Sequence, residues 1–387
     1  MVMADREGVK TASGPVTALT MLGLVGTVGN GLARLPFVHP FRGPGGFADN
    51  LGQSATRLAV RAFMGYTMSL PIPEFRSMER VLDRLCRVVM PPVVGGIGRV
   101  ELEQAQVGGI DGVWCRTKAE AQVDDDGNPV ATQGTILYLH GGGYIGTTPM
   151  MYAAFAAALV RISNCEVFMA DYRMAPEFPY PAGVLDAADV YQALLDRGIP
   201  PEHLIIAGDS GGGGLATSLI HHLHEQGLPR PAAMALFSPE IDLDLNQESM
   251  TANADTDVLP WSIPVAPYLH GLQPNDDRVS AIYSTPEPDW FPPTFICWGG
   301  AEMFRDSIRT FGERLDESEV IVRLMEEDGM FHVFPILMPW AESSKRVFKT
   351  LTALAGVHVA PEPRTDAPGT AGADTPAQAA PVPAGET

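Results

Sequence analysis

Cysteines are scarce in this chain of 387 residues, and basic residues are outnumbered by acidic ones. The four cysteines, at positions 86, 115, 165 and 297, lie far apart, a spacing that argues against a disulfide framework and against a metal site built on paired cysteines. Lysine and arginine total 26 against 46 aspartates and glutamates, which gives a net charge of −20. This charge argues against nucleic acids and anionic membranes as partners and favours neutral substrates.

Long, strongly apolar runs are also missing. The stretch from Thr11 to Ala33 has no charged residue, but its glycines and threonines dilute it below the ~20 strongly apolar residues that a membrane span needs. Asp5 and Glu7 make the preceding segment a poor start for a signal peptide. We expect this stretch to pack over the rest of a cytoplasmic protein; the alternative is export or membrane association through residues 11–33.

The order of the expected helices and strands divides the chain. Residues 1–95 show no alternation of strands and helices, and we expect amphipathic helices over residues 51–70 and 74–89, the second closed by Pro91 and Pro92. Residues 100–117 predict two strands that meet at Gly108 and Gly109, followed by a turn over residues 124–129. We find no internal repeats.

Strands and helices alternate from Thr135 to about Ala355. Strands are expected at residues 135–139, 166–170, 204–207, 233–237, 294–298 and 320–324, with helices between them, including residues 182–197 and 306–315. This order predicts an α/β fold, a mostly parallel sheet with helices on both faces, over residues 96–358. Residues 244–290 interrupt the alternation as an insertion, and residues 359–387, rich in proline and alanine, are expected to be disordered.

Two glycine-flanked motifs each follow an expected strand directly. The second, Gly208-Asp209-Ser210-Gly211-Gly212, places Ser210 at the tip of a strand-to-helix turn, where a nucleophile is exposed. The first, from His140 to Gly143, offers unhindered backbone N–H groups that can face a developing oxyanion. No Gly-Lys-Ser/Thr follows the glycines, which excludes a phosphate-binding P-loop. Together the two motifs predict acyl-transfer chemistry.

A serine nucleophile needs a base and an acid that orients it. On such a turn the acid and then the histidine follow the serine along the chain. Among the nine histidines, His332 lies in the loop after the last expected strand, which makes it the candidate base. Glu302 and Asp306 both follow the preceding strand; Glu302 is favoured because it is nearer the strand end, and Asp306 remains open because it also fits a helix start. Asp209 is expected to be structural.

Three motifs together resemble the bacterial hormone-sensitive-lipase-like esterases: the His140 motif, the Ser210 motif, and the run from Asp171 to Glu177 with Pro179 and Pro181. The resemblance covers roughly residues 95–355. It implies an α/β-hydrolase fold with a cap built from the N-terminal helices, residues 1–95, and the insertion. It also implies ester hydrolysis without cofactor or metal, and an oxyanion hole formed by the N–H groups of Gly141, Gly142 and Gly211. The run from Asp171 is expected to brace the loop behind the oxyanion glycines.

The expected function is a serine carboxylesterase that acts on neutral esters with short to medium acyl chains. In it Ser210 attacks the ester, His332 relays the proton and Glu302 orients the histidine. Alternatives are a hydrolase of amide, carbamate or lactone bonds, and a non-catalytic binding protein on the same fold. The expected partner is a small-molecule ester; a homodimer is left open, and membrane association is not favoured.

Overall fold

A mixed sheet of eight strands forms the centre of the protein. The computed structural model describes the chain except for residues 1–5, 40–45, 98, 119–131, 261–262 and 356–387. The strands are β1 (Val100–Val107), β2 (Ile110–Thr117), β3 (Thr135–Leu139), β4 (Glu166–Ala170), β5 (Leu204–Asp209), β6 (Ala233–Phe237), β7 (Thr294–Gly299) and β8 (Val322–Glu327). Their order is β1-β2-β4-β3-β5-β6-β7-β8, with β1, β2 and β4 paired antiparallel and all other neighbours parallel.

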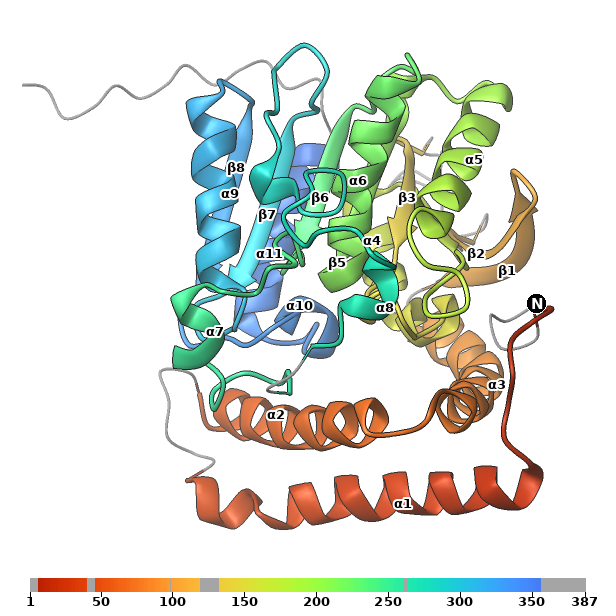
Figure 1. Cartoon of the computed structure of the whole chain (residues 1–387), viewed down its shortest axis with the longest axis vertical. Coiled ribbons are helices and arrows are strands. Elements are labelled where there is room, and N and C mark those ends of the chain that lie inside the picture. The colour runs from red at the N-terminus through yellow and green to blue at the C-terminus, as the bar shows by residue number, and fades with distance from the viewer. Residues whose placement is uncertain (1–5, 40–45, 98, 119–131, 261–262, 356–387) are drawn as a thin grey trace, which may run out of the picture.

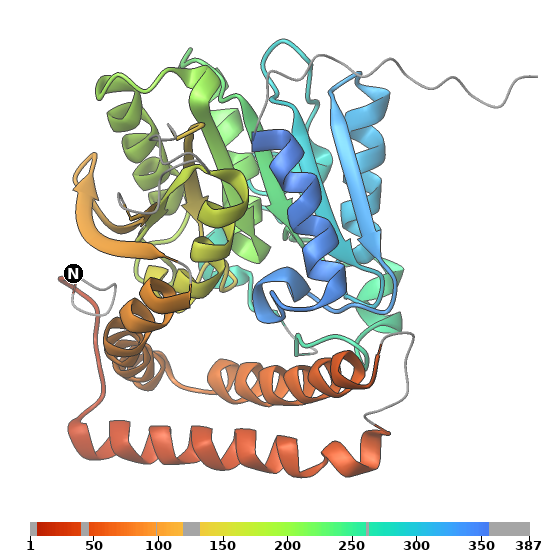
Figure 2. The ribbon, with the colours of Figure 1, turned by 180° about the vertical axis from the view of Figure 1, so that it is seen from behind.

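Helices cover both faces of this sheet, which confirms the predicted fold class. Helices α5 (Ala182–Asp196), α6 (Ser210–Glu225) and α9 (Arg305–Glu317) lie on one face (Figure 1). Helices α4 (Ala153–Ser163) and α11 (Glu342–Ala355) lie on the other (Figure 2). The last strand begins two residues later than expected, because Val320 and Ile321 precede the ladder, and Ile321 is exposed.

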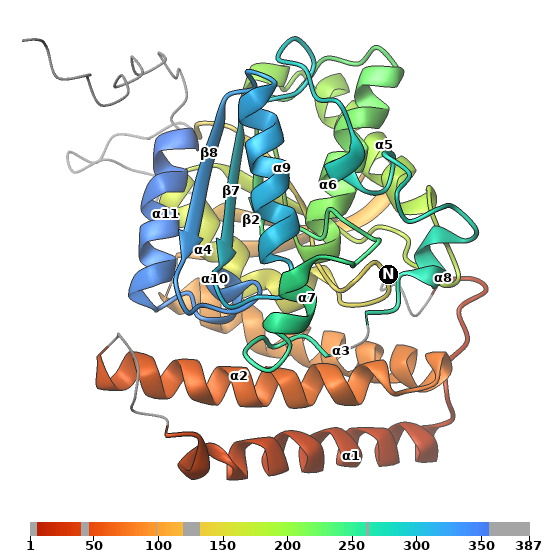
Figure 3. The same ribbon diagram turned by 60° about the vertical axis from the view of Figure 1, so that its left-hand side comes forward.

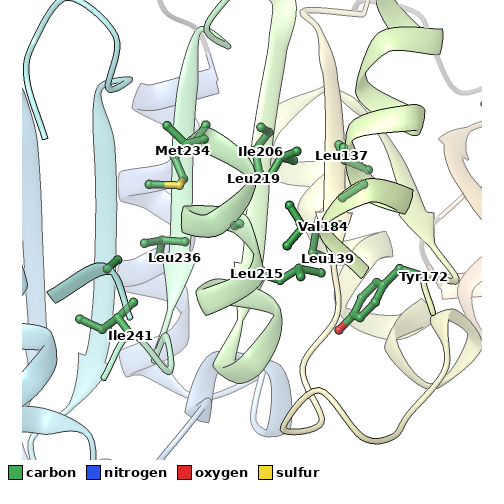
Figure 4. Packing of buried hydrophobic residues seen from close by; sticks show 14 of the residues in the cluster. Leu137, Leu139, Tyr172, Val184, Ile206, Leu215, Leu219, Met234, Leu236 and Ile241 are labelled. Carbon is green, nitrogen blue, oxygen red and sulfur yellow. The ribbon is translucent and has the colours of Figure 1, made fainter. Parts of the chain in front are cut away.

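The core between the sheet and α6 follows from the side-chain periods of the two kinds of element. Leu137 and Leu139 are two residues apart on β3 and therefore point to the same face. Leu215 and Leu219 are four apart on α6 and face them, with Ile206 of β5 between (Figure 4). All five side chains are buried, so this layer fixes where α6 begins relative to the end of β5.

Three helices precede the sheet: α1 (Gly14–Ala33), α2 (Phe47–Met68) and α3 (Ile72–Ile97). Helix α2 lies across the ends of the strands where α6 starts, and α1 lies outside α2 (Figures 1 and 3). The expected end, at Pro91 and Pro92, of the helix over residues 74–89 is wrong, because α3 continues through both prolines. Both are exposed, so water can bind the carbonyls that lose their helical N–H partners.

Short elements fill the remaining connections. The insertion, residues 244–290, contains α7 (Glu248–Ala252), α8 (Ala266–Leu269) and a 3-10 turn at Ala281–Tyr283, and α10 (Phe334–Leu337) follows β8. Helix α1 has the length and composition to cross a membrane. For a single helix near the N-terminus, this is weak evidence of a membrane span. The turn expected over residues 124–129 and the tail over residues 359–387 lie outside the described residues. The division into cap and catalytic domain stays a prediction.

Candidate active site

Ser210 stands at the junction of β5 and α6. It is the first residue of α6 and has φ 51°, in the left-handed region that costs a residue with a Cβ atom energy. The turn is possible because a Cβ on Gly208 would overlap the carbonyl of Gly212, and a Cβ on Gly212 would overlap the carbonyls of Leu139 and His140. The two glycines therefore let the turn close tightly beneath the serine, as the motif predicts.

His332 meets Ser210 from the loop between β8 and α10. Its Nε2 lies 2.9 Å from Ser210 Oγ, a hydrogen-bond distance. Only 2 % of His332 and 8 % of Ser210 is exposed. The pair is therefore largely shielded from water, yet Ser210 and His332 both line one pocket. This arrangement allows the imidazole to take the hydroxyl proton when the oxygen attacks.

Glu302 lies on the other side of the histidine ring. Its Oε1 is 3.5 Å from His332 Nδ1, which is ion-pair range and longer than an ordinary hydrogen bond. Its Oε2 accepts hydrogen bonds from Ser238 Oγ at 2.6 Å and from the N–H of Gly299 at 2.8 Å. These two donors fix the carboxylate after β7, so that its free oxygen faces the imidazole.

Asp306, the alternative acid, faces a different part of the protein. It accepts a hydrogen bond from the N–H of Ser249 at 2.8 Å and pairs with Arg305 at 2.9 Å. These contacts tie α9 to α7, and Arg305 together with Ser249 lowers the pKa of Asp306 against the effect of its partial burial. Of the two candidates, the structure brings Glu302 to His332.

The charge state of the histidine is set by two opposing effects. Burial by itself lowers the pKa of His332, but the nearby carboxylates, Glu302 first and then Asp257 and Asp209, outweigh it and raise the pKa above its usual value. Burial in turn raises the pKa of Glu302, although His332 and Ser238 oppose this. The environment thus favours the imidazolium that forms when the histidine accepts a proton.

Asp257 is a site residue that the sequence did not reveal. Its Oδ1 accepts the N–H of His332 at 2.9 Å, and its Oδ2 accepts the N–H of Met303, the residue after Glu302, at 2.8 Å. One buried carboxylate therefore holds the backbone of His332 and that of the loop after Glu302 together. It belongs to the insertion, where no motif marks it, and its only sequence signal is an acidic residue before the apolar pair Val258-Leu259.

The oxyanion prediction needs a correction at Gly141. Its N–H donates to Asp209 Oδ1 at 2.8 Å and is therefore not free to bind an oxyanion. Asp209 also accepts hydrogen bonds from the hydroxyls of Tyr138 at 2.6 Å and Tyr152 at 3.1 Å. Burial raises the pKa of Asp209 to about 6, against these three donors. Asp209 is thus a structural brace between the two glycine motifs.

The next two glycines carry the available donors. Gly142 and Gly143 have φ 119° and 59°, and both line the pocket that contains Ser210. Gly211 lies in the first turn of α6, where N–H groups have no helical partner, and a Cβ on it would lie 2.9 Å from the backbone N of Tyr144 and 3.2 Å from that of Gly143. Within the described ranges, no hydrogen-bond acceptor is found for these three N–H groups. The donor set that converges near Ser210 is therefore Gly142, Gly143 and Gly211.

The run from Asp171 to Glu177 braces this loop only in part. Glu177 pairs with the buried guanidinium of Arg76 at 2.7 Å, and Arg76 also donates to the carbonyl of Ile145 at 2.6 Å, just after the oxyanion glycines. Arg173, expected in the same role, instead pairs with Asp186 on α5 at 2.7 Å. The expectation for this arginine is therefore wrong, because its side chain points toward α5.

An apolar pocket in two lobes leads away from Ser210. The lobe around the serine has an empty volume of about 950 Å³ that is continuous with solvent, and its walls include Val60, Phe63 and Met64 of α2. The second lobe, which we call the α2–α3 lobe, has a similar volume and runs between these helices past Leu70, Phe75 and Met78. Eight residues line both lobes: Phe63, Met64, Met68, Gly142, Gly143, Thr147, Met151 and Ile263.

The part of the chain that the structure describes contains no group of three or more histidine, cysteine, aspartate or glutamate side chains arranged to hold a metal ion. The chemical groups that meet at Ser210 are its hydroxyl, one imidazole, one carboxylate and three backbone N–H groups. This set suits nucleophilic attack on a carbonyl carbon with stabilisation of the resulting oxyanion.

Comparison with known proteins agrees with this geometry. A family model described as alpha/beta hydrolase fold matches residues 136–336. The chain is 30 % identical to an esterase of Acinetobacter venetianus over 72 % of this chain and 88 % of that protein. It is 25 % identical to the carboxylesterase/phospholipase LipF of Mycobacterium tuberculosis over 79 % and 80 % of the two chains.

A solved structure described as an esterase from the bacterial hormone-sensitive lipase family aligns with a TM-score of 0.66 and 27 % identity, over 78 % of this chain and 97 % of that one. The chain belongs to the hormone-sensitive-lipase-like esterases of the α/β-hydrolase superfamily and is a carboxylic-ester hydrolase.

Proposed function

We propose that the protein is a serine carboxylesterase that cleaves neutral esters of short to medium acyl chains through an acyl-enzyme intermediate. The observation that carries this proposal is the contact of 2.9 Å between His332 Nε2 and Ser210 Oγ, with Glu302 on the far side of the ring. Ser210 Oγ attacks the ester carbonyl while His332 takes its proton. The N–H groups of Gly142, Gly143 and Gly211 receive the oxyanion.

The remaining steps of the reaction use the same groups. The imidazolium of His332 protonates the leaving alkoxide, which departs as the alcohol and leaves the acyl group on Ser210. A water molecule, deprotonated by His332, then attacks the acyl carbon. The imidazolium of His332 returns the proton to Ser210 Oγ as the bond from this oxygen to the acyl carbon breaks, and the acid is released. The raised pKa of His332 supports both steps, because the protonated form must persist until the leaving group departs.

The pocket supports the proposed choice of substrate. Both lobes are lined mainly by aliphatic, aromatic and methionine side chains, so the acyl chain is expected to lie among Met64, Met68 and Phe75. The titratable exceptions among the lining residues outside the proposed triad are Glu79, Tyr152, Asp209 and Glu240. Burial raises the pKa of Glu79 and of Glu240 to about 7 in each case, which lets these walls become neutral near physiological pH.

The test is a chain-length series of 4-nitrophenyl esters with the parent, Ser210→Ala and a control, Ser318→Ala. Ser318 lies at the end of α9, away from the pocket lining. Turnover by Ser210→Ala should fall by about 10³-fold or more, while the control keeps parental rates. An organophosphate should label the parent and the control but not Ser210→Ala. Labelling of Ser210→Ala at another serine would overturn the assignment of the nucleophile.

A further inference from the structure

Helix α1 is built into the protein through one face. The hydroxyl of Tyr66 on α2 donates to the carbonyl of Thr20 at 2.8 Å. A Cβ on Gly23 would overlap Tyr66, and a Cβ on Gly31 would lie 2.9 Å from the methyl group of Ala62, so both glycines let α2 approach closely. These contacts specify a helix–helix interface, and they would be lost if α1 left the protein to cross a membrane.

The other face of α1 is apolar and exposed. Leu19 is 68 % exposed, Leu22 is 69 % exposed and Val25 is 68 % exposed, and the three follow one another at intervals of three residues. All three threonines of α1 (Thr17, Thr20 and Thr27) lie on the covered side. A helix packed on a protein in water has its aliphatic residues inside and its polar residues outside. On α1 the covered side holds Leu24 together with the threonines, and the exposed side carries Leu19, Leu22 and Val25 beside Asn30. The outer face of α1 is therefore mainly apolar, unlike the outer face of an ordinary surface helix.

The exposed apolar surface continues beyond the end of α1. Phe37, in the 3-10 turn Leu35–Val38, is 81 % exposed, and Phe47 at the start of α2 is also exposed. No charged residue occurs from Thr11 to Ala33, and the charges next to this stretch are two exposed cations, Lys10 and Arg34. In Figures 1 and 3 the helix forms the outermost layer of the protein, with no described segment outside it.

The size of this surface argues against a second copy as its cover. A helix of 20 residues is about 30 Å long, and one face of it is about 10 Å wide, so it offers about 300 Å². A stable protein interface takes about 800 Å² from each partner. A lipid surface has no such requirement, because apolar side chains enter the boundary between headgroups and acyl chains individually.

We propose that the outer face of α1 docks on the surface of a neutral lipid bilayer, with the helix axis parallel to the membrane plane. Leu19, Leu22 and Val25 enter the boundary between headgroups and acyl chains, and Lys10 and Arg34 reach the phosphates at the two ends of the helix. The net charge of −20 opposes anionic lipid, so attraction comes from apolar burial. This inference does not depend on the identity of the nucleophile.

The experiment is co-sedimentation of the full chain with phosphatidylcholine vesicles. The parent should bind, and Leu19→Gln/Leu22→Gln should lower the partition coefficient by about tenfold or more. The matched control is Ile321→Gln/Leu324→Gln, which alters exposed aliphatic residues at the β8 edge of the sheet and should bind like the parent. Both variants should hydrolyse a water-soluble ester at the parental rate, which shows that they are folded.

The chemistry of the contact gives a second readout. Raising the salt concentration from 0.05 to 0.5 M should change binding by less than about twofold, and anionic lipid should weaken it, because apolar burial is not screened. Absence of binding by the parent, or equal binding by Leu19→Gln/Leu22→Gln, would overturn the proposal. So would a lipid-free dimer, seen by light scattering, that this double variant converts to monomers, because a second copy would then cover the face.

Discussion

Among single residues, the carboxylate of Glu302 is held by one oxygen and free at the other. Oε2 accepts hydrogen bonds from Ser238 and Gly299, whereas Oε1 has no hydrogen-bond donor among the described residues and lies 3.5 Å from Nδ1 of His332. The longer side chain of glutamate, compared with aspartate, spans from its own loop to the ring while it keeps those two bonds. The role of Glu302 can therefore be tested by a change that removes the charge and preserves the shape.

We expect Glu302→Gln to lower kcat by about 10²–10⁴-fold, because the neutral amide no longer stabilises the imidazolium or selects its tautomer. Asp306→Asn is the matched control and should stay within about threefold of the parent, since an asparagine oxygen can still accept the N–H of Ser249. Turnover at saturating substrate, with circular dichroism to verify folding, measures both. Loss of turnover in Asp306→Asn together with parental turnover in Glu302→Gln would assign the acid to Asp306.

Asp257 gives a second prediction at this scale. In Asp257→Asn one of the two oxygens becomes an NH₂ group, which then faces the N–H of either His332 or Met303. We expect the free energy of unfolding to fall by about 1–3 kcal/mol and kcat to fall by about tenfold as the base shifts. Asp255→Asn, at a carboxylate that is 88 % exposed, is the control for denaturant melts and kinetics. Equal behaviour of the two variants would refute the positioning role.

The sequence predicts Ser210 from the strand–turn–helix motif and His332 from its place after the last strand, but chain order leaves Glu302 and Asp306 both open as the acid. It could not show that the N–H of Gly141 is taken by Asp209, because that depends on the backbone angles of the loop. Nor could it find Asp257, whose place is set by the path of the insertion and not by neighbours in sequence.

Among whole elements, alternating strands and helices were predictable because buried parallel strands are short apolar runs between turn residues. The apolar period of α3 was equally clear, yet Leu85 and Val88 on it are exposed while Met78 is buried. A period shows that a helix has an apolar stripe; it does not show what covers the stripe. Likewise, the sequence of residues 14–33 did not show which side of α1 would be covered.

The contribution of α2 to the pocket wall can be tested by a larger side chain that fills part of the pocket. Met64 lines both lobes, so Met64→Trp should obstruct the passage into the α2–α3 lobe. We expect kcat/KM for acetyl esters to stay within about threefold of the parent and that for octanoyl esters to fall by about tenfold or more, since only the longer chain needs the lobe. Leu22→Trp, on the exposed side of α1, is the control. An unchanged chain-length profile would place the acyl chain elsewhere.

For the molecule as a whole, buried acids make stability depend on pH. Burial raises the pKa of Glu79, Asp171 and Glu240 to about 7 in each case. A raised acid pKa means that the folded state binds protons more tightly than the unfolded chain does. Stability from this source is present at low pH and is lost as the pH rises from the ordinary carboxyl value of about 4 to about 7. The raised pKa of His332 acts in the same direction.

The melting temperature should therefore be lower at pH 8 than at pH 5.5, by about 3 °C or more. Glu240→Gln should reduce this difference, because burial raises the pKa of Glu240 more than the charge of His332 lowers it, and the substitution removes this buried titrating group. Glu342→Gln, at an exposed carboxylate, should leave the difference unchanged. Differential scanning calorimetry at both pH values measures it, and a higher melting temperature at pH 8 would contradict the prediction.

Helix α2 contacts α1 on one side and lines the pocket that contains Ser210 on the other. Any displacement of this helix is therefore shared by both. By thermodynamic reciprocity, a long acyl chain that shifts α2 changes the affinity of α1 for its outer surroundings by the same factor as those surroundings change the affinity for the chain. The affinity for a long acyl chain in free solution and the affinity at a surface are then two values of one coupled equilibrium.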